Sequence, residues 1–213
     1  MQIIEVPAGA RAAIEALVLR DPDFATVERA AGPLPWRTRP AGFAGFLQAI
    51  VSQQISNRAA AAIWGRVTAL PGVLEPEGLL ALPDEALRAA GLSRPKIAHA
   101  RALAEAVFTR ALDPEAIPLM DDDDAIAAIS SVRGLGRWTA EIYLLFALGR
   151  HDVFPAGDLA LAASAAHLKR LSTRPDPRAL RALAETWRPG RGLAARLLWH
   201  HWRHVTGRPT IDE

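Results

Sequence analysis

The chain has 213 residues, half of them hydrophobic, a formal net charge of +2 and no cysteine. Its length suits one compact domain or two small subdomains. The missing cysteine excludes disulfides, thiolate zinc sites, iron–sulfur clusters and a catalytic thiol. The first residues lack the basic start and apolar stretch of a signal peptide, and no run of about 18 apolar residues offers a membrane span. We therefore expect a soluble cytoplasmic protein without membrane contact.

The charges are unevenly distributed along the chain. Residues 1–149 hold 14 Lys and Arg against 17 Asp and Glu, whereas residues 150–213 hold 11 against 6. Arg makes up 23 of the 25 cations, and its planar group favours bidentate contacts such as those to phosphate. A basic C-terminal third is compatible with a nucleic-acid partner, and also with ordinary solvated helix faces.

Apolar residues recur at helical spacing along almost the whole chain, and Ala, Leu and Arg dominate. No alternating run of β-branched residues indicates a sheet, and no repeat of 20–50 residues is present. The predicted fold class is therefore all-α with short loops. The predicted helices are 8–19, 22–31, 41–54, 57–69, 84–90, 95–110, 122–131, 137–148, 158–171, 177–187 and 191–206.

Helix starts are marked by residues that suit the first turn. Ser56 can cap the helix that follows it, and Pro95 lies at the start of another. The acidic run 121–124 is unusual in appearance. Because the helix dipole favours negative charge at its N-terminus, we interpret it as a capping segment that begins with Asp121 or Asp122, and not as a metal site.

Residues 130–140, Ser-Ser-Val-Arg-Gly-Leu-Gly-Arg-Trp-Thr-Ala, join two predicted helices through a Gly-x-Gly turn. Gly134 and Gly136 permit positive φ and remove side chains that would keep a ligand away from the backbone. The amide N–H groups that open the second helix then point outward at the positive end of its dipole and offer a phosphate site. A helix C-cap and tight turn would explain the same residues without any ligand.

Asp158 lies 22 residues after Gly136, directly behind the chain-breaking segment Pro155-Ala156-Gly157, and opens the next predicted helix. By position it is an N-cap. Amide hydrogen bonds and the helix dipole stabilise a carboxylate at this place. An ionised carboxylate is what oxocarbenium-like chemistry at a sugar C1′ requires, so one residue can cap the helix and act chemically.

The hairpin and Asp158 together resemble the helix-hairpin-helix (HhH-GPD) superfamily of DNA glycosylases, with its Gly/Pro-rich loop and catalytic Asp. Within that superfamily the chain most resembles the 3-methyladenine DNA glycosylase II branch. Residues 49–56, Ala-Ile-Val-Ser-Gln-Gln-Ile-Ser, match the loop of that branch that enters the DNA stack. Residues 187–191, Trp-Arg-Pro-Gly-Arg, match its C-terminal Trp-basic-Pro segment. The similarity covers roughly residues 20–205.

The resemblance implies two helical subdomains that contain a helix-hairpin-helix motif and have an active-site cleft between them. One subdomain is continuous, covers 42–150 and contains the hairpin. The other combines 1–41 with 151–213 and carries the catalytic Asp158. The N-terminal β-sheet domain of well-studied bacterial relatives is not expected, because only about 40 residues precede the core and they show no strand pattern.

The resemblance also implies roles for individual residues. Asp158 is the expected catalytic carboxylate, which stabilises the sugar cation and orients the attacking water. Gln54 is the expected wedge that fills the gap left by an extruded base, with Gln53 as its neighbour in the minor groove. The other expected DNA-binding residues are those of the hairpin: Gly134, Leu135, Gly136, Arg137 and Thr139.

Two tryptophans are expected to form the base pocket. Alkylated purines carry positive charge and stack well on electron-rich rings, so Trp138 and Trp187 are the candidate walls. Most tryptophans of a helical protein serve the core, and the role of Trp36 stays open at this point. The tryptophans expected in the core are Trp64, Trp199 and Trp202.

No cofactor is expected, apart from a structural Na⁺ or K⁺. The resemblance places this ion at the backbone carbonyls of Ser130, Val132 and Leu135 in the hairpin. Three histidines near the C-terminus suggest a metal site at first sight, but they lack carboxylate partners and lie among tryptophans, so surface or core roles are expected for them. They are His200, His201 and His204.

The resemblance predicts a monofunctional DNA glycosylase, acting in base excision repair as a monomer. Its substrate is double-stranded DNA with alkylated purines of the 3-methyladenine and 7-methylguanine class, which it excises by base flipping and hydrolysis of the N-glycosidic bond. Trp138 stands where bifunctional relatives carry a Schiff-base lysine, and neither Lys96 nor Lys169 matches that position, so no lyase activity is expected.

Two departures and two alternatives remain. The four-cysteine cluster of the thymine-glycol and adenine-mismatch relatives is absent, and Arg133 stands where the hairpin usually has Pro. The first alternative is a non-catalytic helix-hairpin-helix protein that only binds DNA; the presence of Asp158 argues against it. The second is a glycosylase for another damaged base, such as uracil or oxidised guanine.

Overall fold

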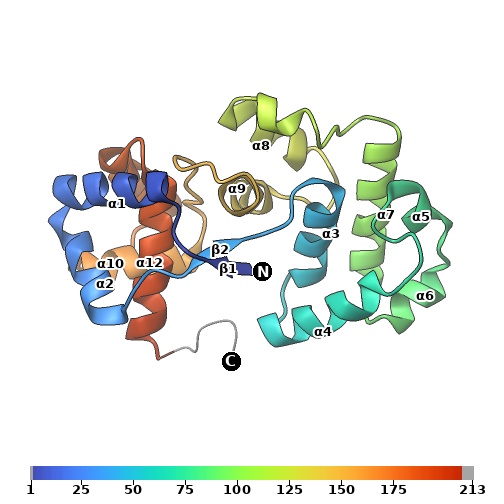
Figure 1. Ribbon diagram of the computed structural model, residues 1–213, viewed down its shortest axis with the longest axis horizontal. Helices are drawn as coiled ribbons and strands as arrows, with labels where there is room; N and C mark the ends of the chain where they lie inside the picture. The colour runs from blue at the N-terminus through green and yellow to red at the C-terminus, as the bar shows by residue number, and fades with distance from the viewer. Residues whose placement is uncertain (1, 208–213) are drawn as a thin grey trace. The chain divides into compact units, whose positions relative to one another are not determined.

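The computed structural model describes residues 2–207, which form two compact units (Figure 1). Within the described residues, unit 1 combines 2–38 with 144–207, and unit 2 is the continuous stretch 39–143. Unit 1 contains β1 (Gln2–Ile4), α1 (Ala8–Arg20), the 3₁₀ turn η1 (Pro22–Phe24), α2 (Ala25–Ala31), β2 (Trp36–Thr38), α10 (Leu159–Leu168), α11 (Pro177–Ala184), η3 (Glu185–Trp187) and α12 (Arg191–Val205). Unit 2 contains α3 (Gly42–Ser52), α4 (Asn57–Thr68), α5 (Pro76–Ala81), α6 (Asp84–Ala89), α7 (Arg94–Phe108), η2 (Ile117–Leu119), α8 (Asp122–Ser130) and most of α9 (Arg137–Phe146).

The core of unit 1 is organised by α12, which packs against α1, α2 and α10 (Figure 1). Ala194, Leu197 and Leu198 recur at spacings of three and four residues and are completely or almost completely buried, as is Leu193. Burying a leucine side chain contributes about 1.5–3 kcal/mol. Their partners come from both ends of the chain, because the same cluster includes Leu17 of α1 and Leu161 of α10.

Arg196 of α12 is a buried cation within this core. Its guanidinium donates to the carbonyls of Arg37, at 2.9 Å, and Leu145, at 2.8 Å. It also lies 4.0 Å from the ring centre of Trp36 and 4.3 Å from that of Phe146. Burial and the nearby Arg37 lower the pKa of Arg196 to about 10. Trp36, whose role the sequence leaves open, is thus a core residue that covers a buried charge.

Unit 2 is built around α7, which contacts α3, α5 and α6 (Figure 1). The rings of Phe46 and Tyr143 stack with 3.9 Å between their centres, and the Tyr143 hydroxyl accepts the amide N–H of Gly42 at 2.9 Å. A Cβ at Gly45 would lie 2.1 Å from the Pro40 carbonyl oxygen, so α3 begins tightly against the preceding turn. These contacts fix the start of α3, whose other end carries Gln53 and Gln54.

The all-α class is confirmed, with one local exception. β1 and β2 form a two-stranded antiparallel ribbon in which Ile4 pairs with Trp36. The expectation that the N-terminal segment contains no strand is therefore wrong. The helices predicted from the sequence also omit α5.

Several helix starts agree with their capping residues. The Ser56 hydroxyl accepts the Ala59 amide at 3.3 Å, and the Asp121 carboxylate accepts that of Asp124 at 2.9 Å. The acidic run is thus a capped helix start, as predicted. No helix in the described part of the chain is both long enough and apolar enough to cross a membrane.

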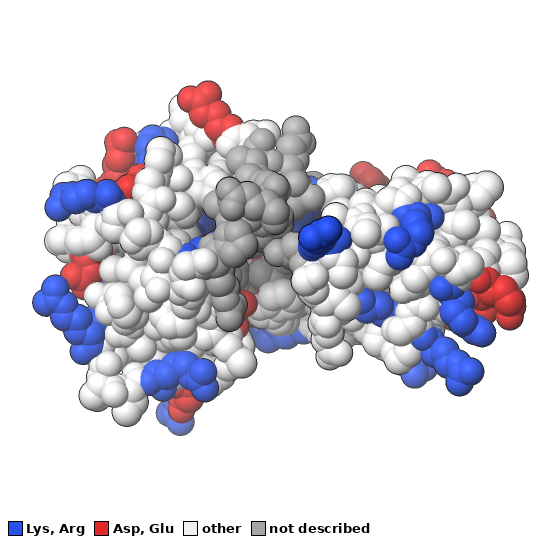
Figure 2. Space-filling view, turned by 90° about the horizontal axis from the view of Figure 1, so that it is seen from below, with Lys and Arg blue, Asp and Glu red and all other residues white. Residues whose placement is uncertain are grey.

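Charged side chains are dispersed on the face shown in Figure 2. Lys and Arg lie singly there, with Asp and Glu among them, and the described residues form no continuous basic stripe on this face. Charge alone therefore does not mark a nucleic-acid site on it.

Candidate active site

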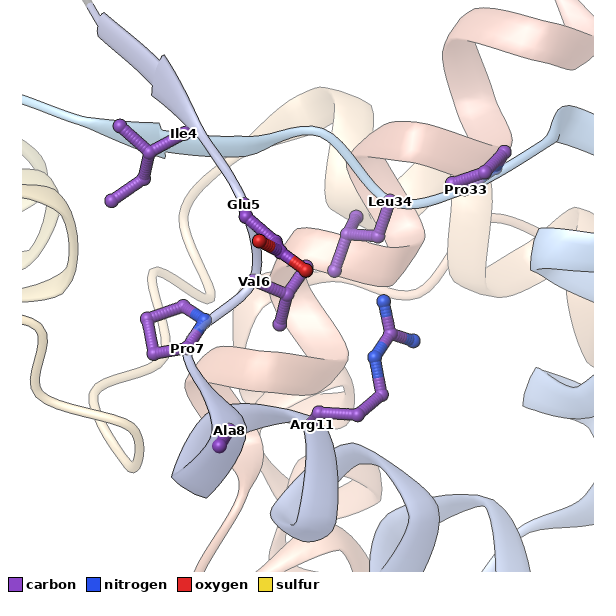
Figure 3. A pocket seen from close by; sticks show the side chains of 8 residues that line it. All are labelled: Ile4, Glu5, Val6, Pro7, Ala8, Arg11, Pro33 and Leu34. Carbon is purple, nitrogen blue, oxygen red and sulfur yellow. The ribbon is translucent and has the colours of Figure 1, made fainter.

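A cavity in unit 1 is lined by residues near the start of the chain (Figure 3). It has a volume of about 770 Å³. The Arg11 guanidinium, which lies at this cavity, pairs with Glu28 at 2.7 Å. No residue that the sequence marks as functional contributes to its wall, which consists of Ile4, Glu5, Val6, Pro7, Ala8, Arg11, Pro33 and Leu34.

Asp158 ends a loop, residues 147–158, that we call the Asp158 loop, and it caps α10 as predicted. Its Oδ1 accepts the amide N–H groups of Ala160 at 2.9 Å and Leu161 at 3.0 Å. The Trp199 Nε1 donates to the same oxygen at 3.3 Å, from α12. The carboxylate is half-buried, and these three donors hold it in one orientation.

Trp199 is a contact that the sequence does not reveal. It was expected in the core, and its ring does pack against Phe146 with 5.6 Å between the ring centres. Its indole N–H, however, reaches the carboxylate that the sequence marks as catalytic. The two residues are 41 positions apart, so no local motif joins them.

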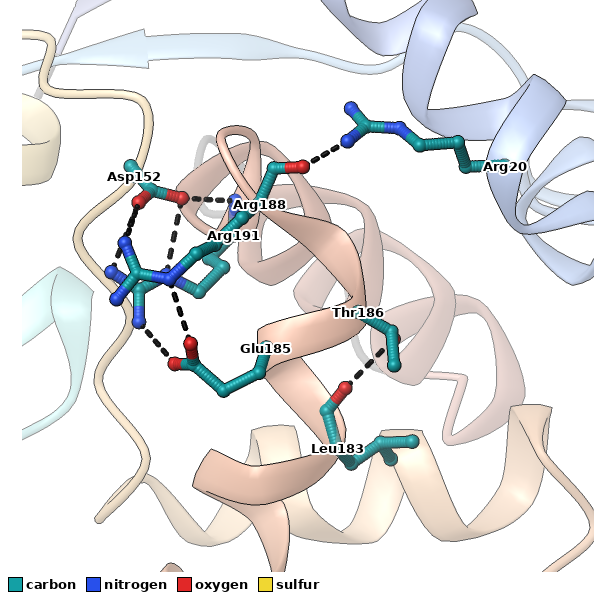
Figure 4. Close-up of polar contacts among 7 residues, drawn as sticks. All are labelled: Arg20, Asp152, Leu183, Glu185, Thr186, Arg188 and Arg191. Carbon is teal, nitrogen blue, oxygen red and sulfur yellow. Dashed lines mark hydrogen bonds and ion pairs between the residues drawn. The ribbon is translucent and has the colours of Figure 1, made fainter.

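Asp152 holds the middle of the Asp158 loop against the start of α12 (Figure 4). Its carboxylate accepts the Arg191 side chain at 3.0 and 3.1 Å, the Arg191 amide at 3.2 Å and the Arg188 guanidinium at 2.8 Å. Glu185 receives the same two arginines, at 2.7 Å from Arg188 and 2.6 Å from Arg191. Arg20 donates to the Arg188 carbonyl in addition.

The same loop approaches the α12 backbone at Gly192. The Gly192 amide donates to the His151 carbonyl at 2.7 Å. A Cβ at this position would lie 2.8 Å from that oxygen and 2.9 Å from the Val153 carbonyl oxygen, which leaves no room for a side chain. The Trp-Arg-Pro-Gly-Arg segment therefore anchors the loop that presents Asp158, and Asp152 is the partner that sequence reasoning missed.

Trp187 lies in the core of unit 1 and not at a surface. It has no exposed surface, and its ring makes edge contacts with Phe24 and Phe154 at centre-to-centre distances of 5.4 and 5.7 Å. Its indole N–H donates to Asp21 at 2.7 Å, and Lys169 pairs with the same carboxylate. A side chain enclosed in this way has no face for a base, so the geometry does not support Trp187 as a pocket wall.

The hairpin, residues 131–136, joins α8 to α9 in unit 2, and its two glycines differ. Gly134 has φ +95°, and a Cβ on it would meet the His99 side chain at 2.4–2.8 Å. Its conformation and its packing on α7 both require glycine. Gly136 is exposed, and a Cβ on it would meet nothing within 4 Å. Packing within the protein therefore does not explain why residue 136 is glycine.

The other predicted hairpin residues are placed differently from one another. Leu135 is buried and its amide donates to the Val132 carbonyl at 3.0 Å, so both groups serve the turn itself. Thr139 is buried as well, so its hydroxyl is not exposed for a contact with DNA. Arg137 is half-exposed and pairs with Glu141 at 2.9 Å.

Trp138 opens α9 with 43% of its surface exposed, the largest exposure of any tryptophan among the described residues. It is the second residue of the helix, and the first backbone bond after the hairpin runs from the Ala140 amide to the Gly136 carbonyl at 3.0 Å. The amide N–H groups of this first turn lie at the positive end of the helix dipole. An exposed aromatic ring therefore lies beside the expected phosphate site.

Gln53 and Gln54 follow α3 and have different environments. The Gln53 Nε2 donates to the Gly134 carbonyl at 2.8 Å. Gln54 is exposed and has φ +57°, a left-handed conformation that is uncommon for residues other than glycine. The structure thus brings Gln53 to the hairpin and leaves Gln54 as the projecting residue.

The expected carbonyl ligands of a monovalent cation lie where α8 ends. Ser130 is the last residue of α8, and Val132 already accepts the Leu135 amide with one of its lone pairs. The Ser130 hydroxyl is buried without a hydrogen-bond partner. The unpartnered Ser130 hydroxyl lies next to the carbonyl groups at the end of a helix. This arrangement fits a bound Na⁺ or K⁺, because all the ligands that it offers are oxygen atoms.

Three cations of the basic C-terminal third are paired with carboxylates inside unit 1. Arg188 and Arg191 pair with Asp152, and Lys169 pairs with Asp21 and with Asp23 at 2.8 Å. The excess of cations there therefore does not indicate DNA contact by itself.

Among the described residues no three His, Asp or Glu side chains are placed to hold a metal ion. The His167 Nδ1 and His201 Nε2 atoms lie 3.0 Å apart as a hydrogen-bonded pair between α10 and α12.

Comparison with protein families gives a match over most of the chain. The family model described as the HhH-GPD superfamily base excision DNA repair protein matches residues 47–189. The chain is 32% identical to DNA-3-methyladenine glycosylase 1 of Schizosaccharomyces pombe over 157 residues, which cover 72% of this chain and 69% of the relative. It is 32% identical to the probable bifunctional transcriptional activator/DNA repair enzyme AlkA of Mycobacterium tuberculosis, over 95% of this chain and 42% of that longer relative.

Two solved structures are similar over nearly their whole length. The DNA-3-methyladenine glycosidase of Bacillus halodurans has a TM-score of 0.81 and 30% identity, covering 100% of this chain and 98% of its own. The 3-methyladenine DNA glycosylase of Schizosaccharomyces pombe, in complex with abasic DNA, has a TM-score of 0.77 and 28% identity, covering 95% of this chain and 99% of its own.

Proposed function

Because the chain belongs to the HhH-GPD superfamily of base excision DNA repair proteins, we propose that it is a monofunctional DNA glycosylase for alkylated purines. Its substrates are 3-methyladenine and 7-methylguanine in double-stranded DNA, and it acts as a monomer. The relatives named 3-methyladenine DNA glycosylases support this substrate class.

The observation that carries the proposal is the setting of Asp158. Three N–H donors fix one oxygen of its carboxylate, and the side chain is half-buried at a helix N-terminus. A carboxylate held in this way needs no reorganisation when positive charge develops nearby. A protein that only binds the negatively charged DNA backbone gains no affinity from a carboxylate at this position.

The reaction breaks the bond between C1′ of the sugar and the purine nitrogen, and the bonding electron pair leaves with the base. A cationic alkylated purine leaves as a neutral molecule, which makes it a good leaving group. The Asp158 carboxylate stabilises the oxocarbenium-like sugar and orients a water molecule toward C1′. The water oxygen bonds to C1′ and its proton passes to solvent, so the products are a free base and an intact abasic strand.

The exposed ring of Trp138 is the surface on which the flipped base stacks. Cationic purines are attracted to an electron-rich ring, whereas neutral bases lack this attraction. Stacking on one aromatic side chain contributes about 1–3 kcal/mol. Because Trp187 is buried in the core, two factors remain to explain a preference for charged bases. They are stacking on Trp138 and the easier departure of a cationic purine as a neutral molecule.

The hairpin binds a phosphate near the lesion through backbone amides. Open space in front of Gly136 lets the phosphate approach the start of α9, where the helix dipole favours negative charge. Gln54 projects from its loop and enters the stack after the base has left it. Extrusion of a base costs a few kcal/mol, part of which such a wedge offsets.

Strand cleavage is not part of the proposed activity, because the two lysines of the chain have other partners. The Lys96 ammonium donates to the Val51 carbonyl at 2.7 Å. Burial lowers the pKa of Lys169, but hydrogen bonds and attraction from Asp21 and Asp23 outweigh it and raise that pKa, so the amine stays protonated. Borohydride treatment of enzyme with alkylated DNA should give no covalent adduct, and a trapped adduct at either lysine would contradict this part.

We also propose that the carbonyls of Ser130, Val132 and Leu135 hold a Na⁺ or K⁺. When bound, the ion would supply positive charge beside the phosphate. The hairpin should then be more stable in K⁺ or Na⁺ than in choline at equal ionic strength, measured as the thermal midpoint of unfolding without DNA. Equal midpoints in all three salts would remove the ion from the proposal.

The central test is Asp158→Asn. Asparagine caps a helix about as well as aspartate, so the fold and the affinity for DNA should change little. Base release from methylated DNA should fall by at least about a thousandfold, in line with the loss of an electrostatic group in the transition state. A folded variant that still releases bases would refute the role of Asp158, and a wild-type protein that binds DNA without releasing any base would be the non-catalytic binder. Light scattering of the same preparations tests whether the protein is a monomer in solution.

A further inference from the structure

Gln53 is positioned to act on the protein itself and not on DNA. Its side-chain amide donates to the Gly134 carbonyl at 2.8 Å, across 81 positions of sequence. The side chain is half-buried, whereas the following residue, Gln54, is exposed. A neutral amide-to-carbonyl hydrogen bond of this length contributes about 0.5–1.5 kcal/mol net.

The acceptor of this bond cannot shift by itself. Gly134 packs on the His99 side chain of α7 so closely that no Cβ fits between them. The turn around it is closed by the bond from the Leu135 amide to the Val132 carbonyl at 3.0 Å. A displacement of the Gly134 carbonyl therefore requires the hairpin to move as a whole.

The donor side is held from α7 as well. Lys96, in the first turn of α7, donates its ammonium to the Val51 carbonyl at 2.7 Å, at the end of α3. Burial lowers the pKa of this lysine, in keeping with its enclosed position. The chain is thus fixed at Val51 and again at Gln53, immediately before Gln54.

Gln54 needs such support because of its backbone. Its φ of +57° costs about 1 kcal/mol or more for a residue with a side chain, and such conformations persist only where the surroundings impose them. The two contacts from α7 and from the hairpin are surroundings of this kind. They hold the residue that projects from the loop in one direction.

We infer that Gln53 is a positioning residue that locks the wedge loop, residues 53–55, to the phosphate-binding hairpin. Gln54 then enters the DNA stack in register with the phosphate that the hairpin amides hold, and Gln53 makes no essential contact in the minor groove. This inference rests on the proposed function, because it assigns the wedge to Gln54 and the phosphate site to the hairpin. It replaces the minor-groove role expected from the sequence.

The test compares Gln53→Met, which keeps the length of the side chain but removes the donor, with the matched control Gln48→Met on the preceding helix α3. Single-turnover base release from DNA with 7-methylguanine should be about tenfold slower in Gln53→Met, equivalent to roughly 1.4 kcal/mol. The dissociation constant for undamaged DNA should stay within about twofold. A loss of the same size in Gln48→Met would overturn the inference, because the effect would then belong to α3 and not to the Gly134 contact.

The decisive comparison uses Gln54→Ala as background. If Gln53 acts only through Gln54, Gln53→Met should cause no further loss of rate when Gln54 is already Ala. The effects of two residues that act through the same side chain are not additive. An additional tenfold loss there would mean that Gln53 acts independently of the wedge and would overturn the inference.

A second readout separates this inference from the proposed function. DNA with 2-aminopurine next to a tetrahydrofuran abasic analogue should gain less fluorescence with Gln53→Met than with the wild type, since the loop unstacks the neighbour less well. This signal requires no base release. A wild-type protein that unstacks 2-aminopurine but releases no base refutes the proposed function alone, whereas equal fluorescence of both proteins refutes the inference alone.

Discussion

The Asp158 loop and the hairpin hold their backbones by different means. Charged side chains secure the Asp158 loop, because Asp152 joins it to Arg191 and Arg188. Glycine and neutral hydrogen bonds secure the hairpin, where Gly134 packs on His99 and accepts the Gln53 amide. The first region should therefore depend on charge, and the second should depend on the absence of a Cβ.

The largest expected effect concerns the charged region. Asp152→Ala removes the acceptor of the Arg191 amide and one of the two carboxylates that bind the Arg191 guanidinium, and should destabilise the protein by about 3 kcal/mol, because Asp152 and Arg191 are both mostly buried. Chemical denaturation measures this loss. Glu185→Ala is the matched control, since the more exposed Glu185 binds the same arginines and its loss should cost much less stability than the loss of Asp152. Equal losses would mean that Asp152 is not the anchor of the loop.

The next effect concerns the required glycine of the hairpin. Gly134→Ala adds a Cβ that collides with His99 at a positive φ and should cost about 2 kcal/mol of stability. The same denaturation experiment measures it. A stable Gly134→Ala variant would show that the hairpin relaxes around a side chain, and the contrast with the charged loop would weaken.

The two candidate pocket tryptophans, one in each unit, should respond in opposite ways. Trp138→Ala should slow the release of 7-methylguanine at least about tenfold, or roughly 1.4 kcal/mol, with little change in stability. Trp187→Phe removes a buried hydrogen bond to Asp21 and should cost about 1 kcal/mol of stability while the folded enzyme keeps its rate. Slow release by a fully folded Trp187→Phe variant would return that residue to the active site.

The smallest expected effect separates the two hairpin glycines. Gly136→Ala should change stability by less than about 0.5 kcal/mol, because nothing lies near the added Cβ. Its affinity for abasic DNA should fall about fivefold, or roughly 1 kcal/mol, as the methyl group keeps the phosphate from the amides. Fluorescence anisotropy provides the measurement. Unchanged affinity would leave the hairpin as a structural turn.

Local signals in the sequence predict the helices and their caps well. Ser56, Asp121 and Asp158 are capping residues because their side chains reach backbone amides two or three positions later. The same sequence does not predict the ribbon of β1 and β2, because three-residue strands are too short to show alternation. Local chemistry decides the first kind of feature and long-range pairing the second.

The candidate site is less predictable for the same reason. Asp158 and the hairpin are visible as motifs, but the contacts that hold them come from residues far away, such as Trp199 and Gln53. Trp187 is a more instructive case. It belongs to a family-like segment, yet the partners that bury it, Phe24 and Asp21, lie more than 160 positions earlier, so the segment does not reveal that the ring is enclosed.

The order of segments in unit 1 has a consequence for synthesis on the ribosome. Helices α1 and α2 leave the ribosome first, but their packing partner α12 is made last. At about 5–20 residues per second, the interval between them is on the order of 10 to 30 s. Unit 2 is complete within that time, whereas Leu17, Phe24 and Val27 remain without their final neighbours. The nascent N-terminal segment is therefore the part of the chain that needs a chaperone bound to its exposed apolar residues. Slow translation before α12 should increase the aggregation of this segment.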